Sequence, residues 1–211
     1  MFFTKSLFEK MLAAAAAAIE ANAAMLNQLD AAIGDGDHGT AITAAIRTAA
    51  ESIKKSGTFS EVLQTVGFDV MGSTSGSTSA LNGLFFTGLG EAIESEELDA
   101  DQTTEAFAAG LVNVRTMTQA KTGDKTLLDA LIPAVEAMGK LKGTAGTTLP
   151  QMFAEAAAAA KDGAESTRDL AAKQGRARNL GERSKGHLDA GAVSTSLIYT
   201  AYAEAVKRLY R

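Results

Sequence analysis

Alanine dominates several long stretches of this 211-residue chain, and only two prolines interrupt it. Alanine has the highest helix propensity of the natural residues, whereas proline breaks helix interiors. The alanine runs at residues 13–18 and 156–160 are typical of helices that approach one another closely. No stretch shows the alternation of apolar and polar residues that predicts a half-buried strand. The sequence therefore predicts an all-α fold of about eight helices.

Hydrophobic spacing and capping residues predict where these helices begin and end. Ser60 fits the N-cap of the third helix, Asp99 or Asp101 that of the fifth, and Pro150 the first turn of the seventh. No linker-like composition divides the chain, so we expect one domain over residues 1–211. The predicted helices span residues 4–30, 39–55, 58–71, 79–93, 99–115, 126–138, 148–163, 164–173 and 192–210.

Charge and cysteine content restrict the partners. The formal net charge of −5 argues against nucleic acid, because phosphate backbones select basic surfaces. The chain has no cysteine, which excludes disulfides and thiolate metal sites and fits a reducing compartment. The apolar run at residues 11–19 is mostly alanine and predicts neither a signal peptide nor a membrane span. We therefore expect a cytoplasmic protein without membrane or nucleic-acid partners.

An acidic loop at residues 30–40 carries the strongest chemical signal. Asp30, Asp35 and Asp37 lie among glycines, with no lysine or arginine between them. Neighbouring carboxylates repel one another unless a positive charge lies between them, and their oxygens are the hard ligands that Mg²⁺ and Ca²⁺ prefer. The calcium EF-hand pattern fails, because Ile46 stands where that loop needs a bidentate glutamate. The loop therefore predicts a divalent metal that in turn holds phosphate.

The same loop matches the dinucleotide pattern G-x-G-x-x-G at Gly34, Gly36 and Gly39. That pattern needs a strand before it, whereas the residues before Gly34 are predicted to be helical. Two of its variable positions are aspartates, which would repel a pyrophosphate. The P-loop pattern and the G-x-S-x-G nucleophile elbow are both absent. We therefore reject the dinucleotide interpretation.

Three further loops carry residue types that bind phosphate. Residues 72–79 offer hydroxyls and flexible amides before a helix, residues 122–126 open a helix and offer a lysine, and residues 175–191 are rich in arginine and lysine. Taken singly, each loop is more often a solvated connector. His38 and His187 are predicted to lie in loops, and two histidines without any cysteine are too few for a zinc site. Together with the acidic loop they predict a bound polyphosphate.

The motifs in this combination resemble the nucleotide-binding (L) subunit, or L domain, of the dihydroxyacetone kinase family. The resemblance covers essentially the whole chain, and several separated motifs occur in the family's order. They are Asp30 with Gly34-Asp35-Gly36-Asp37-His38-Gly39, then Gly123-Asp124-Lys125-Thr126, Gly175-Arg176-Ala177, Leu180-Gly181-Glu182-Arg183-Ser184, and Gly186-His187 with Asp189.

The resemblance implies an eight-helix antiparallel up-and-down barrel with a nucleotide held by the loops at one end. It also implies two Mg²⁺ ions on Asp30, Asp35 and Asp37, with ADP or ATP as the bound nucleotide, and no catalytic residue beyond these metal ligands. The implied nucleotide contacts are His38, Gly39, Thr40, Ser77, Thr78, Gly123, Arg176, Asp189, Ala190 and Gly191.

The chain departs from the family pattern around the nucleotide. Ala41 replaces an asparagine, Asn179 replaces a tyrosine, and Ala190 replaces the proline of Asp-Pro-Gly. The family's Gly-Gly-Ala-Ser-Gly-Pro segment is replaced by Ser75-Gly76-Ser77-Thr78-Ser79-Ala80. The metal loop is intact, so the activity class is kept, and the acceptor is left open between dihydroxyacetone and a related ketose or tetrose.

A free-standing chain of this length resembles the phosphotransferase-system branch of the family. That branch implies a ketose-binding K subunit as partner and a phosphohistidine-bearing protein that rephosphorylates ADP in place. The alternatives are an ATP-dependent ketose or tetrose kinase subunit, a non-catalytic nucleotide sensor that docks on a regulator and, more weakly, a metal-dependent phosphatase. Whether the chain forms a homodimer is left open.

Overall fold

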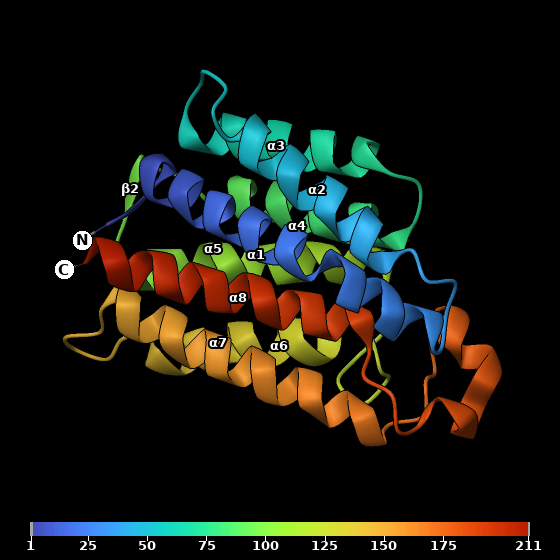
Figure 1. Ribbon diagram of the computed structural model, residues 1–211. Helices are drawn as coiled ribbons and strands as arrows, with labels where there is room; N and C mark the ends of the chain where they lie inside the picture. Colours follow the sequence, from blue (N-terminus) through green and yellow to red (C-terminus); the bar gives the residue numbers. More distant parts are fainter. Residues whose placement is uncertain (1, 211) are drawn as a thin grey trace.

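The computed structural model describes residues 2–210, and helices account for most of them (Figure 1). Two short strands, β1 (Phe3–Thr4) and β2 (Glu97–Leu98), pair antiparallel with Phe3 opposite Leu98. These strands are absent from the sequence-based prediction; the all-α class is otherwise confirmed. The helices described are α1 (Lys5–Ala31), α2 (His38–Ser52), α3 (Phe59–Ser73), α4 (Ser77–Glu91), α5 (Ala100–Met117), α6 (Leu128–Leu141), α7 (Leu149–Ser166), the 3₁₀ helices η1 (Thr167–Asp169) and η2 (Arg176–Ser184), and α8 (Ala190–Leu209).

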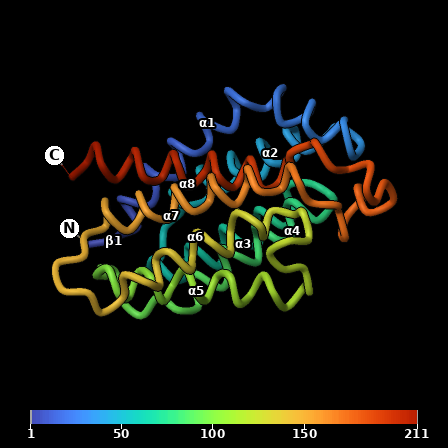
Figure 2. Tube along the Cα trace, turned by 90° about the horizontal axis from the view of Figure 1, so that it is seen from below, coloured from blue at the N-terminus to red at the C-terminus, as the bar shows by residue number. Residues whose placement is uncertain are grey.

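Each α-helix packs against the next one along the chain, and α8 packs back against α1. Consecutive α-helices run in alternating directions, so their connections gather at two ends (Figures 1 and 2). Both termini and the β1–β2 pair lie at one end, on the left of Figure 1. The connections that follow α1, α3, α5 and α7 lie at the other, which we call the loop end. No helix in the range 2–210 is both long and apolar enough to cross a bilayer.

Aromatic side chains fill the core at the β1–β2 end. Phe3 and Phe107 are fully buried and stack edge-on at 5.9 Å between ring centroids. Aromatic pairs at such separations add to the stabilisation that burial of their area already gives. The cluster closes this end of the bundle and leaves the loop end as the place where polar groups gather. The other rings paired with Phe3 or Phe107 are Phe8, Phe59, Phe85, Phe153 and Tyr199.

The third helix begins at Phe59, and its N-cap is Thr58, so the prediction of Ser60 is wrong. The Thr58 hydroxyl accepts a hydrogen bond from the Glu61 N–H at 3.3 Å, and the Glu61 carboxylate accepts one from the Thr58 N–H at 2.9 Å. This reciprocal capping box satisfies two backbone donors of the first turn. The Ser60 hydroxyl instead donates to the Gly90 carbonyl on α4 at 2.7 Å. The fifth helix is capped by Asp99, one of the two predicted residues.

The predicted break at Gly163 and the separate helix at 164–173 are also wrong. Helix α7 continues through Gly163 to Ser166, and only η1 follows it. Gly163 lies against α6, where an added Cβ would come within 2.0 Å of the Asp129 carbonyl oxygen. Close packing of α7 against α6, rather than the end of a helix, therefore explains why residue 163 is a glycine. Within the predicted irregular stretch 175–191, residues 176–184 form η2, kinked at Gly181.

Candidate metal centre and polar cavity

A cavity of about 310 Å³ opens at the loop end of the bundle. Its walls come from the α1–α2 loop, the start of α4, the loop before α6, the segment before η2 and the start of α8. Chain segments far apart in the sequence thus meet at one place, as the connections on the right of Figure 1 show.

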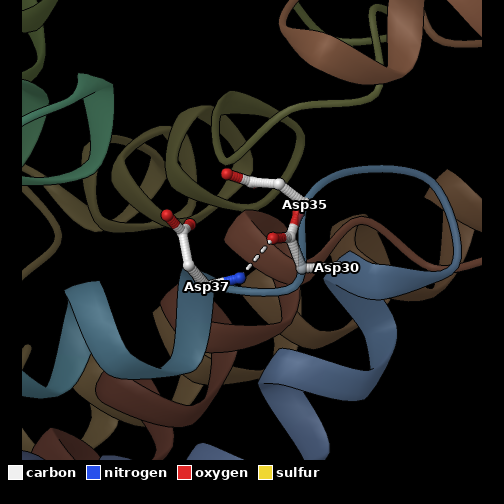
Figure 3. Close-up of side chains that lie close together, drawn as sticks. All are labelled: Asp30, Asp35 and Asp37. Atoms are coloured by element: carbon white, nitrogen blue, oxygen red, sulfur yellow. Dashed lines mark hydrogen bonds between the residues drawn. The ribbon is translucent and has the colours of Figure 1, made fainter.

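The three aspartates of the acidic loop lie together at this cavity. Asp30 is in the last turn of α1, Asp35 is in the loop, and Asp37 directly precedes α2. Each offers a carboxylate oxygen within 4.8 Å of those of the other two, and Figure 3 shows the three side chains converging. This donor set fits a divalent cation such as Mg²⁺, because hard carboxylate oxygens at this spacing can share one coordination sphere.

Asp30 also orders the loop that carries its partners. Its Oδ2 accepts backbone N–H bonds from Gly36 at 2.8 Å, Asp37 at 3.0 Å and His38 at 3.3 Å. Figure 3 marks the bond from Asp37. The carboxylate therefore holds the loop backbone with one oxygen and keeps the other for a ligand. Asp37 makes no side-chain capping bond to α2, so its carboxylate is not committed to the helix.

The glycines of the loop are explained by backbone packing. An added Cβ at Gly34 would lie 2.4 Å from the Asp30 Oδ1, and one at Gly39 would lie 2.0 Å from the Ala23 carbonyl oxygen. Gly36 has a φ of +81°, which favours glycine. Helix α1 precedes Gly34 where a dinucleotide site needs a strand, so the G-x-G-x-x-G match is excluded as such a site.

His38 is the first residue of α2, so its placement in a loop was wrong. Its Nε2 lies 2.9 Å from the Ser194 Oγ on α8, and its Nδ1 lies 3.4 Å from the Thr78 Oγ1 on α4. Burial lowers the pKa of His38 below its ordinary value, although Asp30 acts to raise it. A neutral imidazole therefore joins three helices at the cavity wall, where it can hydrogen-bond without adding charge.

The start of α4 supplies groups that suit an anion. Gly76 precedes the helix with a φ of +125° and gives it no side-chain cap, so the first-turn amides near Ser77 and Thr78 lack such a partner. Free N–H groups at a helix N-terminus favour a bound phosphate. Arg176 lies across the cavity and pairs with Asp35. Acidic, amide and guanidinium groups thus share one cavity.

The start of α8 is capped by Asp189, whose Oδ2 accepts the Ala192 N–H at 2.8 Å. Burial raises the pKa of Asp189 to about 7, and the nearby Lys125 ammonium opposes that rise. Lys125, the lysine of the predicted 122–126 loop, does line the cavity, but it is only 2% exposed. Its Nζ donates to backbone carbonyls instead of extending into solvent.

Most of the residues named from the sequence line the cavity, and a few do not. Gly39 packs on α1, Thr40 bonds through its N–H to the Asn27 side chain at 3.1 Å, and the Gly123 N–H bonds to Asp129 at 2.6 Å. These three lie outside the lining. Of the predicted metal and nucleotide ligands, those that line it are Asp30, Asp35, Asp37, His38, Ser77, Thr78, Arg176, Asp189, Ala190 and Gly191, and Lys125 and Thr126 of the 122–126 loop also line it.

Sequence reasoning missed an apolar part of the lining, since isolated leucines and alanines carry no motif. These side chains form a patch on which a flat ring could lie. The patch consists of Ile33, Leu81, Ala120, Leu127 and Leu128.

Comparison with known proteins identifies the relatives of this chain. Its sequence matches the DAK2 domain over residues 32–204. It is 33% identical over 185 residues to the ADP-binding subunit DhaL of PEP-dependent dihydroxyacetone kinase 1 from Listeria innocua, covering 87% of each chain. It is 34% identical over 186 residues to an L-erythrulose kinase from Pectobacterium atrosepticum, covering 86% of this chain and 31% of that one.

A solved structure shows the same fold. The dihydroxyacetone kinase from C. freundii, crystallised in complex with AMP-PNP and Mg²⁺, superposes with a TM-score of 0.73 at 26% identity. The match covers 97% of this chain and 34% of that kinase. By sequence and by fold, the chain belongs to the DAK2-domain family of dihydroxyacetone kinase subunits and domains.

Proposed function

We propose that this chain is the nucleotide-carrying subunit of a dihydroxyacetone-type kinase. It holds ADP or ATP with two Mg²⁺ ions and passes the γ-phosphoryl group to a ketose bound on a separate K subunit. A phosphohistidine-bearing protein then rephosphorylates ADP in place. One observation carries the proposal: three carboxylates within 4.8 Å of one another face a cavity that also holds a helix N-terminus and an arginine.

The residues have distinct roles in this proposal. Asp30, Asp35 and Asp37 would hold the metal, which when bound neutralises phosphate oxygens and aligns them for in-line transfer. Asp30 keeps the loop in shape through its backbone bonds. Arg176, now paired with Asp35, is placed to exchange that carboxylate for a phosphate oxygen once metal neutralises the acidic loop. No side chain is needed as a general base, because phosphoryl transfer depends mainly on positioning and charge neutralisation.

The first turns of α4 and α8 complete the proposed nucleotide site. Amides at Ser77 and Thr78 would receive phosphate oxygens, and the apolar patch would receive the adenine ring. Gly39, Thr40 and Gly123 lie outside the cavity lining, and the backbone N–H groups of Thr40 and Gly123 bond to the Asn27 and Asp129 side chains. We further propose that the ring of packed helices is an eight-helix up-and-down barrel and that residues 1–211 form one domain.

An ATP-dependent ketose or tetrose kinase is the second candidate. The similarity to an L-erythrulose kinase favours a four-carbon ketose as the acceptor, and this chain matches 31% of that longer protein. The two candidates share the nucleotide site and differ in phosphoryl donor and acceptor. The substituted segment at Ser75–Ala80 and Ala190 leaves both open.

Reconstitution tests the proposal. The purified chain should carry ADP that resists dialysis and is released by EDTA, as mass spectrometry of the denatured protein would reveal. Mixed with a K subunit, it should phosphorylate ketose from a phosphohistidine donor; turnover from free ATP alone would favour the second candidate. Bound ADP without ketose phosphorylation in either mixture would indicate a non-catalytic sensor, and phosphate release from simple esters would indicate a phosphatase.

A further inference from the structure

Lys125 is a buried cation that the proposed chemistry does not use. It is 2% exposed and is the one non-glycine residue with a positive φ, 61°, among residues 2–210. Its Nζ donates to the Thr167 carbonyl at 2.5 Å and to the His187 carbonyl. Burying an ammonium group and holding its backbone in the left-handed region are both unfavourable, so the surrounding contacts must fix this arrangement.

These contacts join the loop before α6 to η1 and to the segment before α8. Thr167 lies in η1, which follows α7, and His187 precedes the cap of α8. The Thr167 hydroxyl accepts the Asp189 N–H at 2.9 Å and donates to the Ala164 carbonyl at 2.6 Å. One side chain from the loop before α6 and one from η1 thus hold the residues that begin α8.

Further bonds run through the same segment. The Gly186 N–H donates to the Arg168 carbonyl at 2.8 Å, and the Lys173 N–H donates to the Asp124 carbonyl at 3.1 Å. Neither η1 nor Lys173 lines the cavity, yet both bind the loops that do. Burial lowers the pKa of Lys125, and the nearby carboxylates of Asp189 and Asp129 act to raise it. These two carboxylates therefore favour the charged ammonium that donates to the carbonyls.

We propose that Lys125 and Thr167 form a latch that sets the affinity for the nucleotide by holding the Asp189–Gly191 turn against the 122–126 loop. The inference rests on the proposed nucleotide site and adds positioning residues to it. Lys125 lines the cavity, but its Nζ is held by two backbone carbonyls, and Thr167 lies outside the lining and acts through Asp189. The aspartates proposed to bind metal lie at the end of α1 and in the α1–α2 loop, so the latch should leave metal binding intact.

The test compares nucleotide binding with metal binding in two variants. Thr167→Val removes the acceptor for the Asp189 N–H and keeps the side-chain volume, and Lys125→Met removes the donor to both carbonyls. Each should weaken Mg²⁺-dependent ADP binding about tenfold in titration calorimetry, the loss expected for a buried hydrogen bond. Binding of Mn²⁺ alone, followed by electron paramagnetic resonance, should not change.

Matched controls separate the latch from general destabilisation. Thr103→Val removes another fully buried hydroxyl that bonds a backbone carbonyl, but at the β1–β2 end. Lys121→Met removes an exposed ammonium from the same loop as Lys125. Both should bind ADP as the parent does, and Thr167→Ser, which retains the hydroxyl, should restore near-parent affinity. The double variant Thr167→Val/Lys125→Met should lose little more than the weaker-binding single variant, because both changes release the same turn.

Two results would overturn the latch while leaving the nucleotide site in place. One is parent-like ADP affinity in both variants; the other is a loss in Lys125→Met that is much larger for ADP than for AMP, which would indicate direct contact with phosphate. A parent that binds no ADP would instead refute the proposed function. In that case, and also if the variants fail to fold, amide hydrogen exchange of the parent protein still tests the latch. In the parent, the amides of Gly186 and Asp189 should exchange slowly, and rapid exchange would contradict the latch.

Discussion

At the end of the molecule where β1 and β2 pair, phenylalanine rings from β1, α5 and α7 pack together and are buried. At the loop end, carboxylates converge beside a cavity, and a lysine is buried on backbone carbonyls. Apolar burial favours the folded state wherever it occurs, whereas clustered like charges and uncapped amides oppose it unless a ligand compensates. The difference assigns stability chiefly to one end and binding to the other, so substitutions at the two ends should have separable effects.

The largest expected effect comes from the aromatic end. Phe107→Ala should lower the free energy of unfolding by about 3–5 kcal/mol, because it leaves a cavity among Phe3, Phe85 and Phe153. Urea unfolding measures the loss, and Phe107→Leu should lose less. At temperatures where the variant stays folded, its metal affinity should equal that of the parent; a parallel loss of metal binding would break the separation.

The next effect comes from the acidic loop. Asp37→Asn should weaken retention of Mg²⁺ and ADP by more than about 100-fold, since even the outer partners of metal ligands are worth about 10- to 100-fold. The apo protein should unfold at the parent's urea midpoint or above it, because one of three crowded charges is removed. If the variant binds ADP with Mg²⁺ as well as the parent does, the assignment of the loop is wrong.

Gly39→Ala is a structural exception inside the binding end. The added Cβ would come within 2.0 Å of the Ala23 carbonyl oxygen, so α2 must shift away from α1. We expect a loss of about 1–3 kcal/mol in unfolding free energy together with weaker ADP binding. Thermal unfolding and calorimetry on one preparation would check both. Unchanged stability with weak binding would instead show that Gly39 acts at the ligand alone.

A further effect is a pH dependence carried by Asp189. Its pKa is raised from 3.8 to about 7 by burial, so between these values the folded state binds more protons than the unfolded state. The contribution of this group to stability therefore falls as the pH rises through that window and is constant above it. The difference in unfolding free energy between the parent and Asp189→Asn, measured from pH 5 to 8, should show this slope. A difference that does not vary with pH would contradict the buried carboxyl.

The sequence predicted the elements whose signals are local. Helix spacing, the aspartates of the acidic loop and the cap at Asp99 all follow from residues close together in the chain. Ser60 was misassigned because Thr58, two residues earlier, competes for the same capping role and gains the reciprocal bond from Glu61. Gly163 was misread as a helix end because its close neighbour Asp129, on the adjacent helix α6, is far away in the sequence.

The burial of Lys125 illustrates what a single sequence does not reveal. A lysine between an aspartate and a threonine in a polar loop normally points to solvent. Here its acceptors lie 42 and 62 residues away, on segments that only the folded bundle brings together. The apolar patch of the cavity was missed for the same reason, since Leu81 and Leu127 become neighbours only through packing.

Calorimetric titration of the apo protein with ADP, in matched buffers containing either Mg²⁺ or EDTA, tests the central claim most directly. We expect binding in Mg²⁺ and a loss of at least about 100-fold in affinity in EDTA, because the proposed carboxylates would hold the nucleotide only through the metal. Equal affinity in both buffers would contradict the claim, and so would the absence of binding in Mg²⁺.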